Sequence, residues 1–196
     1  MTKIPLAVLI SGNGSNLQAL IDASAAADFP AQIVLVISNQ PDAYGLTRAK
    51  EAGIPTAFIS HKDFITREAF DRALSDMIEA YGGEIICLAG FMRVLSEWFV
   101  KRYEGRLLNI HPSLLPKFKG VDTHARALEA GETEAGCTVH WVATEVDSGD
   151  ILAQARVPVL AGDTAQTLAA RVLKEEHRIY PEVLKQVCAD RLANRQ

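Results

Sequence analysis

The chain has 196 residues, of which 48% are hydrophobic and 22% charged, and its formal net charge at pH 7 is −4. This length supports one domain with a sizeable core and excludes two ordinary domains. No run of lysine or arginine forms a basic stripe and no apolar run is long enough to span a bilayer, so we expect neither a nucleic-acid partner nor a membrane partner.

The first predicted elements are a strand, a loop and a helix. Residues 6–10 are an uninterrupted apolar run, which is typical of parallel strands covered on both faces. A loop of small residues follows at 11–16, and Leu17, Leu20 and Ile21 then recur at helical spacing. Such a junction exposes unpaired amides at the positive end of a helix dipole, where a phosphate can bind. A plain tight turn is the alternative, and a dinucleotide fingerprint is disfavoured because Leu17 stands where its third glycine would be.

Strands and helices continue to alternate in the next eighty residues. Arg67 precedes an amphipathic helix and is either solvated or used on an anionic ligand. Residues 90–95 combine a glycine with apolar groups after a strand, which suits either the wall of a pocket for a flat ring or a lid over the core. The elements expected in this part of the chain are strands at 33–38, 56–59 and 84–89 and helices at 43–52 and 70–81.

A short strand at 107–110 carries the residues with the clearest chemistry. Pro112 ends it, because proline cannot donate a ladder hydrogen bond. Side chains alternate along a strand, so Asn109 and His111 share one face near its carboxyl end, where open α/β sheets bind ligands. An amide donor beside an imidazole can stabilise an oxyanion while a proton moves. In the alternative interpretation Asn109 only turns the chain and His111 caps a loop.

The remaining pattern predicts a helix at 124–130, strands at 137–142 and 151–160, and a long last helix. We expect this last helix to begin with a capping box at Asp163 and Gln166 and to kink at Pro181. The short connection between the two strands implies antiparallel pairing. His140 is either a satisfied strand histidine or a pocket neighbour. We therefore expect a single Rossmann-like α/β domain with a mostly parallel, mixed central sheet flanked by helices. Residues 1–105 would form its phosphate-binding half, and residues 106–196 its catalytic half and C-terminal helix.

Several motifs resemble a known family. They are residues 10–17 (ISGNGSNL), 88–93 (LAGFMR) and 108–116 (LNIHPSLLP), followed by Val139-His140 and by Asp147. In this order and over nearly the whole chain they resemble the folate-dependent formyltransferases, in particular the phosphoribosylglycinamide formyltransferase family. The resemblance implies formyl transfer from 10-formyltetrahydrofolate, a co-substrate, to the amino group of glycinamide ribonucleotide. The products would be formylglycinamide ribonucleotide and tetrahydrofolate, in de novo purine biosynthesis and without a metal.

The resemblance also implies residue roles. Its catalytic trio matches Asn109, His111 and Asp147, with Asp147 pairing with His111 and favouring the charged ring. We expect the acidic loop at 143–150 to lie at the same sheet edge as His111. Residues that match the nucleotide-substrate site are Asn13, Gly14, Ser15, Asn16 and Glu176. Residues that match the folate site are Arg67, Met92, Arg93, Val94, Leu95, Asn109, Ala143, Thr144, Glu145, Val146 and Asp147.

Other interpretations remain open. Taken alone, Asp147 is a solvated loop carboxylate, and Glu176 is either a surface charge or a ligand residue. A formyltetrahydrofolate hydrolase or another folate-dependent formyltransferase would use the same chemistry, and a nucleotide-binding sensor would need only the glycine loop. The acidic balance disfavours a tRNA substrate. Three dispersed cysteines and the lack of an N-terminal signal pattern lead us to expect a cytoplasmic protein. An exposed helix face is compatible with a dimer, so monomer and homodimer both stay open.

Overall fold

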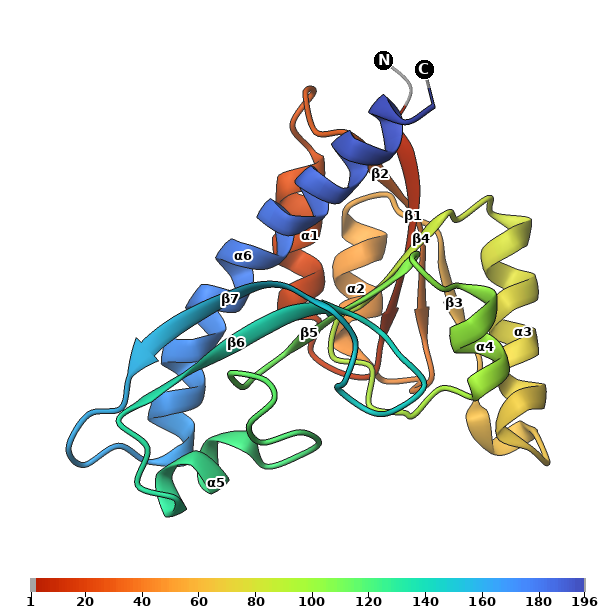
Figure 1. The fold of residues 1–196 in the computed structure, drawn as a ribbon. Helices are drawn as coiled ribbons and strands as arrows, with labels where there is room; N and C mark the ends of the chain where they lie inside the picture. The colour runs from red at the N-terminus through yellow and green to blue at the C-terminus, as the bar shows by residue number, and fades with distance from the viewer. Residues whose placement is uncertain (1–2, 196) are drawn as a thin grey trace.

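The computed structural model describes residues 3–195, which form one seven-stranded sheet with helices on both faces (Figure 1). The strands are β1 (Ile4–Ile10), β2 (Ala31–Ser38), β3 (Thr56–Phe58), β4 (Ile85–Leu88), β5 (Leu107–His111), β6 (Glu134–Trp141) and β7 (Ile151–Pro158). Their order is β3-β2-β1-β4-β5-β6-β7. The first five in this order are parallel, whereas β6 and β7 pair antiparallel. The predicted mixed, mostly parallel α/β sheet is confirmed.

Helices cover the two faces of the sheet unequally. They are α1 (Ser15–Ser24), α2 (Tyr44–Glu51), the short 3-10 helix η1 (His61–Asp63), α3 (Arg67–Ala80), α4 (Glu97–Arg102), α5 (Thr123–Glu129) and α6 (Ala165–Ala193). Helices α1, α2 and α6 contribute to a core that reaches from β1 to β7. On the other face α3 and α4 bury residues of β1, β2 and β4 and the start of β5, but none of β6 or β7. Helices α3 and α4 therefore leave this face of the β5–β7 region open, and we call it the uncovered face.

The N-cap of the last helix is the residue after the predicted one. Thr164 is the N-cap of α6, because its side chain and that of Thr167 each accept a hydrogen bond from the other's backbone N–H. The carboxylate of Asp163 instead pairs with Arg171 at 2.7 Å, so the capping box predicted there was wrong. The helix continues through Pro181 up to Ala193.

Both parts of the chain share one core. The expected boundary between residues 105 and 106 lies just before β5, and β4 pairs with β5 across it. Helix α6 packs against α1, and the hydroxyl of Tyr180 donates to the carbonyls of Leu88 and Leu108 at 3.1 and 3.3 Å. None of the helices between residues 3 and 195 is long and apolar enough to cross a membrane.

Candidate active site

The uncovered face of β5 carries Asn109 and His111. Leu108 and Ile110 point into the core beneath α1 and α6, while Leu107 packs toward α3 and α4. The alternation of the strand therefore places Asn109 and His111 on the face with Leu107, beyond the reach of α4. His111 is buried at 5% exposure and Asn109 is half-buried. The structure thus brings the amide and the imidazole together on one face, beneath loops.

Both ring nitrogens of His111 face acceptors. Its Nδ1 lies 3.4 Å from Oδ2 of Asp147, and its Nε2 lies 3.0 Å from the carbonyl oxygen of Phe118. The same carboxylate oxygen accepts a hydrogen bond of 2.8 Å from the backbone N–H of Gly120. Because a carboxylate and a carbonyl can only accept, a hydrogen bond to either of them requires the ring nitrogen that faces it to be the donor.

The acidic loop leaves the sheet at the opposite end of β5 and reaches His111 only by folding back. Since β6 runs antiparallel to β5, the loop starts beside Leu107, where the N–H of Val142 donates to the Leu107 carbonyl at 2.9 Å. Residues 142–150 must then fold back over the uncovered face to bring Asp147 to the end of β5. Asp147 has a φ of 50°, a left-handed conformation that aspartate and asparagine tolerate better than most residues.

Asn109, His111 and Asp147 form a polar cluster, and His140 is its fourth member. It lies opposite Asn109 in the antiparallel register of β5 and β6 and is only 1% exposed. Its Nε2 is 3.1 Å from Nδ2 of Asn109 and 3.7 Å from Oδ1 of Asp147, and its Nδ1 is 2.8 Å from the carbonyl oxygen of Trp141. The sequence left its role open, because the strand pairing that places it beside Asn109 is not visible in a single sequence.

The glycine loop forms the start of α1. Gly14 is the N-cap with a φ of 74°, and no side chain caps the helix. The first amide groups of α1, at Ser15 and Asn16, are therefore available to an anion. Asn13 is exposed, and its carbonyl and Oδ1 accept hydrogen bonds of 2.9 and 3.1 Å from Arg48. This loop retains the features that suit a phosphate.

Gly14→Ala should destabilise the fold by more than the roughly 1 to 2 kcal/mol that a left-handed backbone costs an ordinary residue. A Cβ at this position would lie 2.6 Å from the Cα atom of Gly45, so strain and overlap add. Gly12→Ala is the matched control, because its Cβ meets nothing within 4 Å and its φ is not positive. Urea unfolding of both variants tests this; equal destabilisation of the two would contradict it.

Asn16 and Glu176 meet between α1 and α6. Nδ2 of Asn16 donates to Oε2 of Glu176 at 2.6 Å, and Glu176 is 6% exposed. Burial raises the pKa of the Glu176 carboxyl, and the hydrogen bond from Asn16 partly opposes this. Among residues 3–195 it has no cationic partner within ion-pair distance. A buried carboxylate held by an amide keeps acceptor sites for the hydroxyl groups of a ligand.

Glu176→Gln should raise thermal stability near neutral pH. Because the folded state raises the pKa of Glu176, the charged carboxylate destabilises the fold as pH rises past its unfolded value. Glutamine removes this cost and keeps an oxygen that accepts from Asn16. We expect a gain of a few degrees at about pH 8, since 1 kcal/mol is worth about 2 to 4 °C in a chain of this size. The gain should vanish below about pH 4, where glutamate is protonated in both states. Calorimetry that finds the same gain at both pH values would contradict this expectation.

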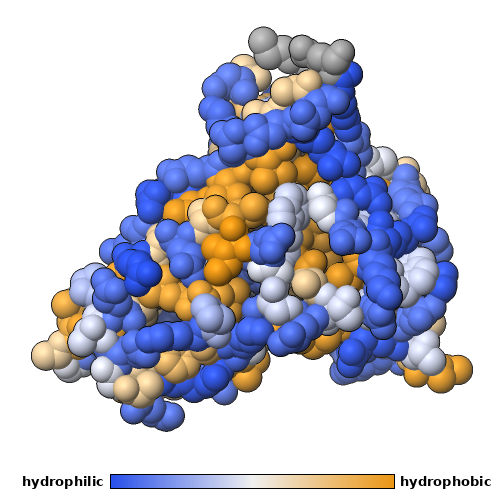
Figure 2. All heavy atoms as spheres, in the orientation of Figure 1, coloured by the Kyte–Doolittle hydropathy of each residue, from blue (hydrophilic) through white to orange (hydrophobic). Residues whose placement is uncertain are grey.

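Apolar side chains of two loops stand open to solvent near the cluster. Met92, Val94 and Val146 are 71%, 47% and 45% exposed, whereas Leu95 is buried. The backbone N–H of Met92 donates to the hydroxyl of Ser11 at 2.8 Å, which ties the loop after β4 to the glycine loop. Figure 2 shows apolar surface between polar flanks in the middle of the face that it views. A flat apolar ligand could cover such a surface.

The other residues expected at the folate site differ in their surroundings. Arg67 is exposed at the first position of α3, and Arg93 lies over the ring of Phe70 at 5.3 Å. Burial raises the pKa of Asp71, against the hydrogen bond from Ser96 and these two arginines. In the acidic loop, Ala143 is half-buried, Thr144 is exposed, and exposed Glu145 pairs with Lys119 at 3.0 Å.

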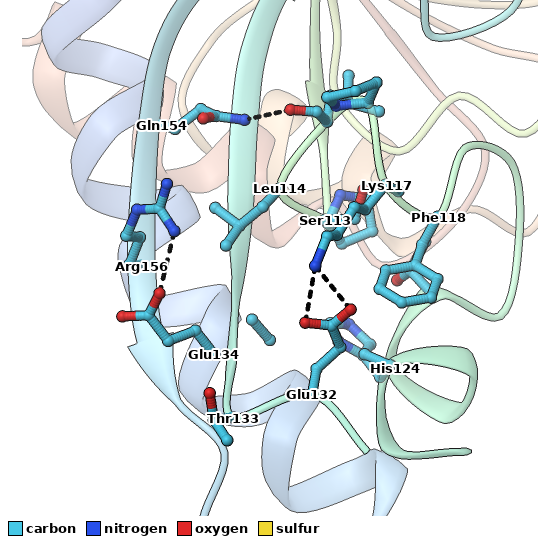
Figure 3. Close-up of a pocket in the computed structure, with 16 residues that line it drawn as sticks. Ser113, Leu114, Lys117, Phe118, His124, Glu132, Thr133, Glu134, Gln154 and Arg156 are labelled. Atoms are coloured by element: carbon cyan, nitrogen blue, oxygen red, sulfur yellow. Dashed lines mark hydrogen bonds and ion pairs between the residues drawn. The ribbon is translucent and has the colours of Figure 1, made fainter. Parts of the chain in front are cut away.

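A cavity of about 280 Å³ lies behind the segment that follows β5 (Figure 3). Residues 112–118, the start of α5 and parts of β6 and β7 line it. Two ion pairs stand at its wall, Lys117 with Glu132 at 2.8 Å and Arg156 with Glu134 at 3.0 Å. None of the predicted site residues lines this cavity, so we place the candidate chemistry at the cluster on the uncovered face. Between residues 3 and 195, no group of three or more His, Cys, Asp or Glu side chains is placed to hold a metal ion.

The fold and the cluster define the class of this protein. A glycine loop at the N-terminus of α1 and the cluster of Asn109, His111, His140 and Asp147 lie beside one α/β sheet. Such an arrangement suits an enzyme that transfers a small group between two bound molecules. Residues 4–184 match the formyl transferase family, and the chain belongs to that family.

Individual relatives agree with this assignment. The chain is 51% identical to phosphoribosylglycinamide formyltransferase of Escherichia coli strain K12, over 95% of this chain and 88% of that protein. The crystal structure of phosphoribosylglycinamide formyltransferase from Brucella melitensis matches with a TM-score of 0.92 at 54% identity, over 96% of this chain and 97% of that one. The trifunctional purine biosynthetic protein adenosine-3 of Bos taurus is 52% identical over 95% of this chain. The chain spans only 18% of the length of that trifunctional relative.

Proposed function

We propose that this enzyme transfers the formyl group of 10-formyltetrahydrofolate to the amino group of glycinamide ribonucleotide in de novo purine biosynthesis. The products are formylglycinamide ribonucleotide and tetrahydrofolate. The observation that carries the proposal is the cluster of Asn109, His111 and Asp147 on the uncovered face of β5. The names of the relatives from E. coli and B. melitensis support this choice of substrate.

The proposed chemistry needs a charge to be stabilised and a proton to move. The substrate amine attacks the formyl carbon and gives a tetrahedral intermediate with a negatively charged oxygen. Asn109 donates an amide hydrogen to this oxyanion, and His111 stabilises it and relays a proton. The intermediate collapses as its bond to the folate nitrogen breaks. The amine then has lost a proton, and the folate nitrogen has gained one.

Asp147 and Phe118 prepare His111 for this role. The carboxylate at 3.4 Å faces Nδ1 and orients the ring, and the Phe118 carbonyl accepts from Nε2 until substrate binds. Hydrogen bonds to an ionised acceptor are roughly twice as strong as those to a neutral one. The oxyanion therefore replaces the Phe118 carbonyl as the partner of Nε2.

The nucleotide lies at the start of α1. Its phosphate binds to the free amides of Gly14, Ser15 and Asn16 with the helix dipole, next to Asn13. Glu176 accepts hydrogen bonds from the ribose hydroxyls, which suits a buried carboxylate that Asn16 holds through one oxygen and that has no cationic partner among residues 3–195. Substitution of Glu176 by glutamine therefore raises KM for the nucleotide even as it stabilises the fold.

The folate lies along the two loops with exposed apolar side chains. Its ring packs between the segment from Met92 to Leu95 and the loop from Ala143 to Asp147, and its formyl group comes to Asn109. Arg67, exposed at the start of α3, pairs with a carboxylate of the folate tail.

The proposed setting is the cytoplasm. Cys87, Cys137 and Cys188 are free and buried, and burial raises the pKa of the Cys137 and Cys188 thiols to about 12. Unreactive free thiols fit a reducing compartment. All side chains of the cluster come from one chain, which is compatible with the proposed monomer or homodimer.

The test mixes the purified protein with 10-formyltetrahydrofolate and follows deformylated folate with and without glycinamide ribonucleotide. Deformylation that depends on the nucleotide is the expected result. Equal deformylation without the nucleotide would identify a formyltetrahydrofolate hydrolase. Binding of both ligands with no turnover would instead indicate a nucleotide-binding sensor.

A further inference from the structure

Resting on the proposed function, we infer that His140 is a positioning residue. As a neutral ring with its lone pair on Nε2, it orients the amide of Asn109 so that the nitrogen faces the reacting groups. Its Nε2 lies 3.1 Å from Nδ2 of Asn109 and 3.7 Å from Oδ1 of Asp147. The other oxygen of that carboxylate lies 3.4 Å from Nδ1 of His111. Nε2 of His140 thus contacts the amide nitrogen of Asn109 and lies close to the carboxylate that faces His111.

The tautomer of His140 follows from its second contact. Nδ1 lies 2.8 Å from the backbone carbonyl oxygen of Trp141, which can only accept a hydrogen bond. Nδ1 must therefore carry the proton, and in the neutral ring Nε2 is left with a lone pair. The group of Asn109 that approaches this lone pair has to be a donor, which is the NH2 group and not the amide oxygen.

The surroundings of His140 keep the ring neutral. Burial is the main cause that lowers its pKa, and the neighbouring His111 adds to it. The carbonyl of Trp141 and the carboxylate of Asp147 act in the opposite direction but do not outweigh burial. At 3.7 Å, Asp147 is also beyond ordinary hydrogen-bond distance from Nε2.

This orientation decides what Asn109 offers to a substrate. One hydrogen of its Nδ2 goes to His140, and the second remains for the developing oxyanion. If Nε2 of His140 carried a proton, Asn109 would turn its oxygen toward it. An acceptor would then face the oxyanion, and the donor that the proposed reaction needs would be lost.

Two substitutions separate this role from simple packing. In His140→Asn the amide takes the place of Nδ1 but leaves nothing at the position of Nε2. In His140→Gln an amide oxygen can occupy the position of Nε2 and accept from Asn109. We expect His140→Asn to lower kcat about tenfold, because misorienting the oxyanion donor costs only part of what its complete loss costs. Both KM values should stay within about twofold of those of the unsubstituted enzyme. We expect His140→Gln to restore most of that loss.

A double-substitution cycle tests whether His140 acts through Asn109. If it does, His140→Asn lowers kcat no further in a chain that already carries Asn109→Ala. Independent, multiplying losses would overturn the inference, and so would equal kcat values for His140→Asn and the unsubstituted enzyme.

A measurement on the unsubstituted enzyme removes any dependence on how the variants fold. The ¹⁵N chemical shifts of the His140 ring report which nitrogen carries the proton. We expect a proton on Nδ1 and none on Nε2 near neutral pH, and a proton on Nε2 would overturn the inference. Because this readout needs no turnover, it separates a failure of the inference from a failure of the proposed function, which the activity of the unsubstituted enzyme tests.

Discussion

Asn109→Ala lowers kcat by about a hundredfold to a thousandfold, because loss of one oxyanion donor typically costs about 2.7 to 4 kcal/mol in the transition state. The amide is needed only when the formyl oxygen becomes charged, so both KM values change little. Asn109 is half-buried on the uncovered face and its side chain is bonded to His140. Truncation therefore costs little folding free energy compared with a core substitution. Steady-state kinetics with both substrates measure the effect.

A matched control is available at the other end of the chain. Asn194 is exposed at the C-cap of α6, far along the chain from the cluster. Asn194→Ala should leave kcat unchanged. If Asn109→Ala turned over as fast as Asn194→Ala, Asn109 would have no part in the reaction.

Asp147→Asn should lower kcat by about 10² to 10⁴, the range that a positioned proton-transfer group contributes. The substitution removes the charged acceptor that faces Nδ1 of His111 at 3.4 Å, and a neutral acceptor makes a weaker hydrogen bond. Asparagine suits this test because it accepts the left-handed backbone at this position. Its amide oxygen can also accept the hydrogen bond from Gly120. The loop is thus kept while the charge is lost.

Asp150→Asn provides the control within the same loop. Asp150 is exposed, and its substitution removes the same unit of charge three residues away from Asp147. We expect its kcat to stay within about twofold of the unsubstituted enzyme, since exposed charges at a distance are screened. Similar losses for the two variants would mean that the net charge of the loop matters and that the pairing of Asp147 with His111 does not.

The sheet was predictable because its strands are short apolar runs separated by turn residues. The run at 6–10 lies within β1, and the antiparallel pairing of β6 with β7 followed from their short connection. The exact start of α6 was not predictable, because Asp163 and Thr164 are both good capping residues. Which of them caps the helix depends on Thr167 and on Arg171, which draws Asp163 away.

The site was predictable where it depends on a single strand. Alternation alone places Asn109 and His111 on one face. The position of Asp147 was not predictable from physical principles, because a nine-residue loop can fold back in many ways. His140 was missed as a partner of Asn109, because contacts across strands depend on register. The pairing of Asn16 with Glu176 likewise joins residues 160 positions apart.

One experiment tests the central claim most directly. 10-Formyltetrahydrofolate carrying ¹³C in the formyl group is incubated with the enzyme and glycinamide ribonucleotide, and the products are followed by NMR. Direct transfer by the Asn109–His111–Asp147 cluster predicts that all of the label appears as a formamide on the nucleotide, one for each tetrahydrofolate formed. Asn109→Ala should slow this signal without changing the product. Label that appears as free formate, at the same rate with and without the nucleotide, would contradict the account.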